Sequence, residues 1–164
     1  MRRVVRASML TSTMHEVRTR PTFTREAPEM VKLKRVYDPA ARSDGYRVLV
    51  ERLWPRGIRK ENLAADEWLK EVAPSTELRK WFSHDPARWS DFRQRYHREL
   101  SKNPAHARLL ELAHRAAEGT VTLVFSSHDV EHNNAVALKD EVEHRAHRMA
   151  KSASRSVRRQ AHHS

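Results

Sequence analysis

The sequence contains no cysteine and only three glycines in 164 residues. Without thiols, the chain has no disulfide, no cysteine nucleophile and no cysteine-ligated zinc. It also has neither the G-x-x-x-x-G-K-[ST] phosphate loop nor the G-x-G-x-x-G dinucleotide fingerprint. No apolar run reaches the roughly 18 residues that a membrane-spanning helix needs. We therefore expect no cofactor, no membrane partner and a cytoplasmic location.

The net charge of +11 is concentrated at the two ends of the chain. Residues 1–30 carry six arginines and three acids, and residues 144–164 carry six Lys/Arg and no acid. Residues 31–143 hold twenty Lys/Arg and eighteen Asp/Glu, so the central part is nearly neutral. A basic domain is a signature of nucleic-acid binding. Here the charge leaves open weak nucleic-acid binding through the ends.

The chain divides into three expected segments. Residues 1–30 lack a sustained hydrophobic period, which fits a disordered basic leader or an over-extended start, with an organellar transit peptide as an alternative. Residues 31–146 carry the pattern of one folded domain of ordinary size. Residues 147–164 are basic and serine-rich, and they predict a disordered tail.

Three segments have the pattern of β-strands. Residues 31–38 alternate imperfectly, and residues 46–51, "YRVLVE", are rich in β-formers. Because the Asp44-Gly45 turn lies between them, we expect a hairpin-like pair. Residues 120–125, "TVTLVF", are almost continuously apolar, as in a central strand buried on both faces. Residues 66–73 fit either a strand or a helix.

Helix starts are marked by capping residues. Asp85-Pro86 and Asn103-Pro104 each pair an N-cap residue with proline at the first helical position. Apolar stripes follow both, and the second helix ends at Gly119. Ser75 is expected to cap a shorter helix, and a last helix begins around residues 130–132. This order of elements predicts an α/β fold: a single compact domain with a small mixed sheet, a buried central strand and flanking helices.

Two strands are followed by chemically unusual loops. The strand at 46–51 leads into "RLWPRG", and the strand at 120–125 leads into "SSHDVEHNN". Ligands of open α/β sheets bind outside the carboxyl ends of the strands. If the two strands are parallel in one sheet, Arg52 and Arg56 come near residues 129–133. A guanidinium binds a carboxylate or phosphate through two parallel hydrogen bonds, so we expect a small anionic or phosphate-bearing ligand there.

Each residue of this expected site has an assigned role. Arg52 and Arg56 hold the charge of the ligand, Trp54 shapes the pocket, and His132 with Asn133 supplies hydrogen bonds at the start of the last helix. If the protein is an enzyme, Asp129 and His132 are the proton-handling pair of a hydrolase or transferase, because histidine titrates near neutrality and a carboxylate fixes its tautomer.

Several alternatives stay open beside this site. The arginines can pair with Asp129 or with backbone carbonyls, Trp54 can plug the sheet edge, and residues 132–133 can cap the last helix. The domain would then be an interaction module without a ligand. His128, Asp129 and His132 are suitable metal-ligand types but lack a recognisable zinc spacing, so no metal site is predicted.

Four segments resemble the bacterial and archaeal YeaO-like proteins of unknown function, the short branch of DUF-488: "LKRVYD", "YRVLVERLWPRG", "WLKEVAPSTELRKWFSHDPARWSDFRQRY" and "VTLVFSSHDVEHNNAVALKDEV". The resemblance covers nearly everything from Lys32 to Val142 and implies a compact α/β domain without an assigned reaction. A longer branch carries cysteines after its late strand, and their absence here means that thiol chemistry does not transfer. The resemblance adds Arg47 and His84 to the expected ligand-binding residues and places these at signature positions: Arg47, Arg52, Trp54, Arg56, His84, Asp85, Asp129, His132 and Asn133.

Overall fold

The computed structural model describes residues 29–161, and a four-stranded sheet in the order β1-β4-β2-β3 forms its centre. Residues 1–28 of the expected leader and residues 162–164 of the expected tail lie outside the described residues. Strand β4 pairs in parallel with β1 and with β2, and β2 pairs in parallel with β3. The strands are β1 (Val31–Arg35), β2 (Tyr46–Leu49), β3 (Glu67–Trp68) and β4 (Val121–Phe125).

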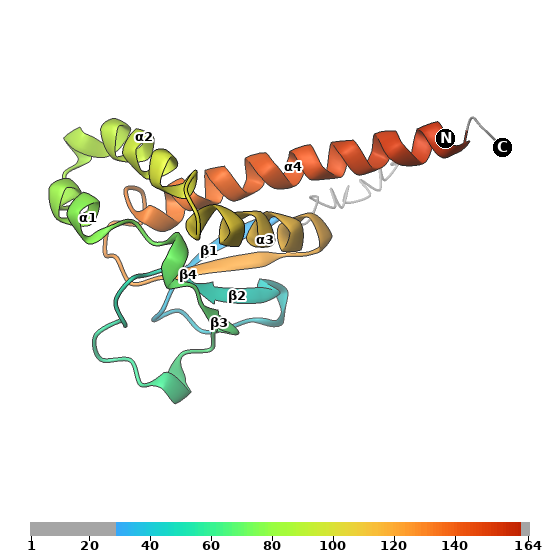
Figure 1. Ribbon diagram of the computed structural model, residues 1–164. Helices are drawn as coiled ribbons and strands as arrows, with labels where there is room; N and C mark the ends of the chain where they lie inside the picture. The colour runs from blue at the N-terminus through green and yellow to red at the C-terminus, as the bar shows by residue number, and fades with distance from the viewer. Residues whose placement is uncertain (1–28, 162–164) are drawn as a thin grey trace, which may run out of the picture.

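The helices lie on one side of this sheet, and the loop between β2 and β3 lies on the other side (Figure 1). Helices α3 and α4 pack side by side, with α3 against β4 and α4 against β1. The helices are α1 (Thr76–Phe82), α2 (Trp89–Leu100), α3 (Ala105–Glu118) and α4 (Asn134–Ala161). Short 3₁₀ turns are η1 (Arg42–Asp44), η2 (Lys60–Asn62), η3 (Lys70–Val72) and η4 (Pro86–Arg88).

The α/β class, the single compact domain and the buried central strand are confirmed. All five residues of β4 are buried, and its side chains alternate between two hydrophobic clusters. Val121, Leu123 and Phe125 face the helices, whereas Val124 faces the β2–β3 loop. Successive side chains of a strand point to opposite faces, so a continuous apolar run is what a sheet covered on both sides requires.

The expected mixed sheet and hairpin are wrong: the described strands are all parallel, and β1 and β2 flank β4 instead of pairing with each other. Residues 36–45 can span up to about 33 Å, twice the roughly 16 Å of β1. The chain can therefore return to the start of the sheet before β2 begins. The turn itself needs its glycine, because Gly45 has φ +62° and a Cβ there would lie 2.1 Å from the Thr120 carbonyl oxygen.

The capping predictions have mixed outcomes. The Ser75 hydroxyl accepts a hydrogen bond from the Leu78 amide at 3.1 Å, and the Asp85 carboxylate accepts one from the Ala87 amide at 3.0 Å, so both caps are confirmed. Asn103 does not cap α3, which begins after Pro104 without a side-chain cap. Residues 66–73 contain both the short strand β3 and the turn η3.

Helix α4 starts later and ends later than expected. The carboxylate of Asp129 accepts hydrogen bonds from the amides of Glu131 and His132, at 2.9 and 2.8 Å, and holds these residues in a turn before the helix. The disordered tail predicted from residue 147 is wrong as far as Ala161, because α4 continues to that residue. No glycine or proline interrupts this sequence. Although α4 is long, no helix within residues 29–161 has the apolar stretch that a bilayer crossing requires.

Candidate functional site

The parallel pairing of β2 with β4 brings the two unusual loops to one edge of the sheet. Val48 lies opposite Leu123, and the Val50 amide donates to the Val124 carbonyl at 3.1 Å. Residues 51–53 and 126–127 therefore leave the sheet side by side. The geometric condition on which the sequence-based site depended is met.

A cavity of about 150 Å³ lies between these loops. Drug-sized ligands usually occupy about 300–1,000 Å³, so this cavity fits a small group such as phosphate, sulfate or a carboxylate. Phe82 and Phe92, which stack with ring centroids 4.4 Å apart, form an apolar part of the wall. The complete lining is Glu51, Arg52, Leu53, Pro74, Arg79, Phe82, His84, Phe92, Ser126, Ser127, Asn133 and Asn134.

Glu51 and Asn134 tie the two loops together. The Glu51 carboxylate accepts hydrogen bonds from the Ser126 amide at 2.7 Å and from the Ser126 hydroxyl at 2.6 Å. The Asn134 side-chain amide donates to the Val50 carbonyl at 2.8 Å. These bonds fix the relative position of segments that are far apart in the sequence.

Two guanidinium groups border the cavity. Arg52 donates from Nε to the Pro74 carbonyl at 3.0 Å and from Nη2 to the Ala73 carbonyl at 3.3 Å. This is the carbonyl-bonded arrangement left open by the sequence, but neutral carbonyls leave the charge of Arg52 uncompensated. Arg79 is half-buried in the cavity wall, and its guanidinium has no hydrogen-bond or ion-pair partner among residues 29–161. With Glu51 as the one carboxylate of the lining, the wall is cationic.

Asn133 both caps α4 and lines the cavity. Its Oδ1 accepts hydrogen bonds from the amides of Ala135 and Val136, at 2.9 and 3.2 Å, and its Nδ2 donates to the Asp129 carbonyl at 2.8 Å. The capping role considered for Asn133 is confirmed. Because Asn133 and Asn134 begin α4, the positive end of the helix dipole lies at the cavity wall.

Asp129 and His132 lie together but outside the cavity lining. Asp129 Oδ2 and His132 Nδ1 are 3.1 Å apart. Hydrogen bonds from the backbone amides of His132 and Glu131 are the main cause that lowers the pKa of the Asp129 carboxyl. The His132 ring packs edge-on against Trp89, with centroids 5.5 Å apart. The structure thus pairs the two predicted proton-handling groups away from the cavity.

Trp54 and Arg56, the other predicted residues of the "RLWPRG" stretch, do not line the cavity. Trp54 donates from Nε1 to the Ile58 carbonyl at 2.6 Å, and its ring meets Trp68 edge-on at 5.1 Å. It packs on the face of the sheet against the cluster that contains Val124, and not at the sheet edge as the alternative had it. Arg56 is exposed and does not line the cavity.

Arg47 and His84, added by the resemblance, lie at different ends of the molecule. Arg47 is 7% exposed at the start of β2, where it pairs with Asp44 and donates to the Ala64 carbonyl. This is the edge opposite to the cavity, so Arg47 serves the fold. His84 lines the cavity and has the left-handed φ of 56°.

Five polar lining residues were not singled out as ligand-binding residues from the sequence: Glu51, Arg79, Ser126, Ser127 and Asn134. Glu51 and Asn134 adjoin predicted residues, and the rule that strand ends carry sites would have included Glu51. Arg79 lies within α1, and no sequence signal distinguishes it from other helix arginines. Arg35, at the end of β1, also supports the site, since its Nε donates to the Ser127 carbonyl at 3.0 Å.

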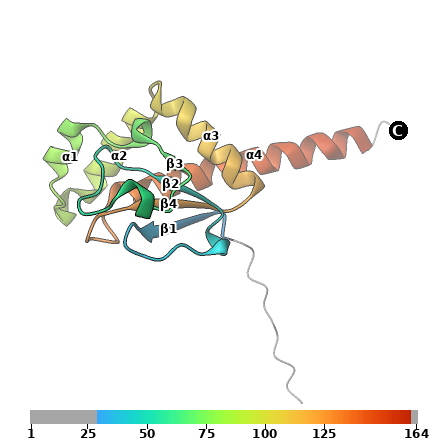
Figure 2. The ribbon, with the colours of Figure 1, turned by 90° about the horizontal axis from the view of Figure 1, so that it is seen from below.

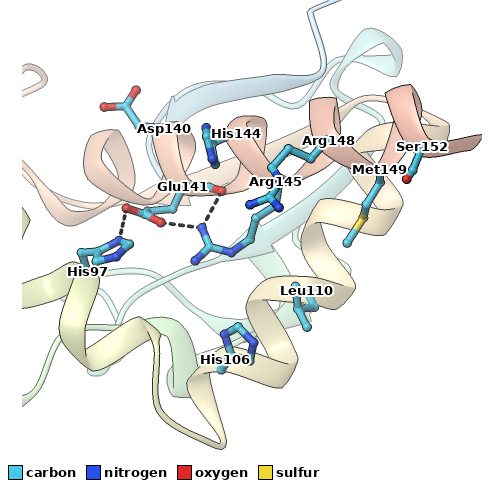
Figure 3. A pocket seen from close by; sticks show the side chains of 10 residues that line it. All are labelled: His97, His106, Leu110, Asp140, Glu141, His144, Arg145, Arg148, Met149 and Ser152. Carbon is cyan, nitrogen blue, oxygen red and sulfur yellow. Dashed lines mark hydrogen bonds and ion pairs between the residues drawn. The ribbon is translucent and has the colours of Figure 1, made fainter. Parts of the chain in front are cut away.

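A larger hollow lies away from these loops, between α2, α3 and α4 (Figure 3). It measures about 770 Å³ and is wide open. On its wall Glu141 pairs with Arg145 and lies 2.7 Å from His97 Nδ1. Burial alone would raise the pKa of Glu141, but the hydrogen bonds from Arg145 and His97 outweigh it and lower the pKa. Within residues 29–161, no group of three His, Asp or Glu side chains is arranged to hold a metal ion.

Sequence comparisons relate the chain to several proteins and to one family. The chain is 47% identical over 110 residues to the uncharacterized protein YeaO of Escherichia coli K12, covering 67% of this chain and 94% of the relative. It is 43% identical over 108 residues to the uncharacterized protein Rv3073c of Mycobacterium tuberculosis H37Rv, covering 66% of this chain and 89% of the relative. No solved structure matches the chain significantly. Residues 30–159 match the family described as the inactive DUF488-N3 subclade, and the chain therefore belongs to this YeaO-like branch of the DUF488 family.

Proposed function

We propose that this protein binds a small anion, or the anionic group of a larger ligand, in the cavity between residues 51–53 and 126–127. One observation carries the proposal: Arg52, at the end of β2, and Arg79, from α1, lie beside one cavity at the edge where β2 and β4 end. The carboxylate of Glu51 is the one acid in the lining, and Ser126 occupies both of its oxygens. An anion of phosphate or carboxylate chemistry would compensate this excess of positive charge.

The donors of the cavity are suited to such a ligand. Arg79 has its whole guanidinium unengaged among the described residues, and Arg52 retains Nη1 beyond its two carbonyl bonds. The Ser127 hydroxyl is buried without a hydrogen-bond partner within residues 29–161. Because the carbonyls of residues 73 and 74 hold Arg52 in place, little side-chain entropy remains to be lost on binding.

The proposal is binding without bond cleavage. The family that matches residues 30–159 is described as inactive. Asp129 and His132 are absent from the lining, and both bond to the turn that precedes α4. We assign them the role of ordering that turn beside the cavity, in place of hydrolase or transferase chemistry.

Ligand-induced stabilisation tests the proposal. Thermal unfolding is measured with inorganic phosphate, sulfate, nucleotides and sugar phosphates, and titration calorimetry follows any shift. A ligand at about 100 times its Kd stabilises the folded state by about 2.7 kcal/mol. Arg79→Gln should abolish this shift. Arg56→Gln removes the same charge outside the cavity, and it should leave the shift intact.

Two outcomes would overturn anion binding at this cavity. One is the absence of stabilisation by any anion of the panel. The other is an equal loss in Arg79→Gln and Arg56→Gln, which would mean that only net charge matters. The alternative of an interaction module without a ligand rests on the carbonyl bonds of Arg52. It predicts that Arg52→Gln lowers stability in the absence of anions, while Arg79→Gln changes nothing.

A further inference from the structure

From His144 onward, α4 carries a stripe of basic side chains along one face. Its members are four and three positions apart, and at 100° per residue they fall within an arc of about 80°. All are exposed, and no acidic residue occurs between residues 144 and 158. The basic stripe consists of His144, Arg148, Lys151, Arg155 and Arg158.

The end of this helix, from residue 150 on, stands free of the domain, whereas His144 and Arg148 border the large hollow. In Figures 1 and 2, α4 runs past the end of the sheet and of α3, and its last turns extend away from the body. Every side chain from residue 150 to residue 158 is exposed. The stripe spans about 21 Å at 1.5 Å per residue. The cations on this projecting part of the helix are therefore accessible to a long polyanion.

The charge of the stripe is also uncompensated within the described residues. Arg145, on the neighbouring face, is engaged by Glu141, and Figure 3 shows both on the wall of the large hollow. Arg148 has no ion-pair partner within residues 29–161, and the same holds for Lys151 and Arg155. The cations of the stripe are therefore free to release counterions when a phosphate chain binds.

We propose that the basic stripe of α4 binds the phosphate backbone of duplex DNA, without reading its sequence. The projecting helix is a cylinder of about 10–12 Å, which the roughly 12 Å major groove of B-form DNA can admit. The major groove of an A-form RNA duplex is too deep and narrow for such an approach. The exposed serines at 152 and 156 add donors for phosphate oxygens on other sides of the helix.

An anionic membrane surface fits this helix less well. Helices that lie in a bilayer interface bury a face of bulky apolar side chains. Between residues 150 and 158 the apolar side chains are Ala150, Ala153 and Val157, and only Val157 exceeds a methyl group. This part of the helix can therefore be attracted to a membrane only through its charge. A DNA duplex offers the same electrostatic attraction through its dense row of phosphates.

The experiment measures fluorescence anisotropy of a labelled 24-base-pair DNA with the full chain at several salt concentrations. The variant replaces four stripe residues: R148Q, K151Q, R155Q and R158Q. The control removes the same charge from exposed residues of the body: R42Q, R59Q, K60Q and K102Q. Glutamine has a helix propensity close to that of arginine and lysine, and circular dichroism checks that α4 is retained.

Each phosphate contact contributes about 0.9 to the slope of log affinity against log salt. The stripe variant should thus lower that slope by about 3 to 4, and it should bind roughly a hundredfold more weakly near 50 mM salt. The body control should keep most of the affinity. Equal losses in both variants would overturn the proposal, as would no binding by the unaltered protein at 50 mM salt.

An RNA duplex and lipid vesicles distinguish DNA from other polyanions, and one variant distinguishes this proposal from the cavity proposal. Equal or tighter binding to a 24-base-pair RNA duplex would overturn the assignment to DNA. The assignment would also be overturned if the protein bound vesicles that contain phosphatidylserine but did not bind DNA. Arg79→Gln, which tests the cavity, should leave DNA binding unchanged, because Arg79 lies in α1 at the sheet edge and not on α4.

Discussion

Glu51, just beyond β2, accepts two hydrogen bonds from Ser126, just beyond β4: one from the backbone amide at 2.7 Å and one from the hydroxyl at 2.6 Å. The two residues are far apart in the sequence and become neighbours only because β2 and β4 are parallel. This pair of bonds closes one side of the cavity. Together with the Asn134–Val50 hydrogen bond, it holds the two loops beside each other.

Replacing Glu51 by alanine should lower the free energy of unfolding by about 1–3 kcal/mol, because two partly buried donors of Ser126 lose their acceptor. Glu51→Gln keeps a side-chain oxygen for the amide and should cost less than Glu51→Ala. Urea unfolding at neutral pH measures both. Equal stability of Glu51→Ala and the unaltered protein would show that the loops are held by other contacts.

The same residue bears on the affinity for anions. Glu51 is the one carboxylate of the lining, so it repels an anion that binds beside Arg79. Removing one like charge at short range in water is worth about 1 kcal/mol, which corresponds to roughly fivefold tighter binding. Titration calorimetry with phosphate should show this gain in Glu51→Gln. A weaker affinity would place the bound anion elsewhere.

The third prediction concerns Ser75, which caps the start of α1. Its hydroxyl accepts from the Leu78 amide at 3.1 Å and donates to Glu99 at 2.5 Å, which also joins α1 to α2. Ser75→Ala should lower the free energy of unfolding by about 1–2 kcal/mol. Ser75→Thr keeps the hydroxyl and is the matched control. Thermal or urea unfolding that gives the same loss for both variants would contradict the capping role.

Local chemistry of the sequence predicted much of this structure. The unbroken apolar run of β4 specified a strand covered on both faces, and the Ser75 and Asp85 caps placed the starts of α1 and of the η4–α2 segment. These features depend on residues close together in the sequence. The juxtaposition of the two loops was also predicted, because the ends of parallel strands share an edge of the sheet.

Long-range contacts explain the failures. The Asp44-Gly45 turn is real, but a turn does not specify which strand the next segment will join, and β2 joined β4. Trp54 follows Arg52 by two residues yet packs beneath the sheet, whereas Arg79 reaches the cavity from α1. Spacing along the chain does not reveal such placements. The serine-rich, basic composition of residues 147–161 likewise suggested disorder, although nothing in that segment breaks a helix already started.

Asp44 provides a pH-dependent prediction at the edge opposite to the cavity. It is 1% exposed, pairs with Arg47, and has Lys34 Nζ 2.8 Å from its Oδ1. Burial by itself raises the pKa of Asp44, but hydrogen bonds from Lys34, the Ala41 amide and Arg47 outweigh it and lower the pKa to about 2, from the usual 3.8. The ionised form is therefore the one that the fold stabilises.

A carboxyl whose pKa is depressed in the folded state stabilises the protein above its unfolded-state pKa and loses this contribution as the pH falls through its folded-state pKa. Asp44→Asn should therefore cost about 3 kcal/mol at pH 7, because Arg47 is left buried without its partner. The difference between variant and unaltered protein should shrink below pH 3.8 and be mostly lost as the pH falls through about 2. Urea unfolding across this range measures it, with the exposed Asp91→Asn as the control. A difference that stays constant from pH 7 to pH 2 would mean that the loss comes from packing and not from the charge of Asp44.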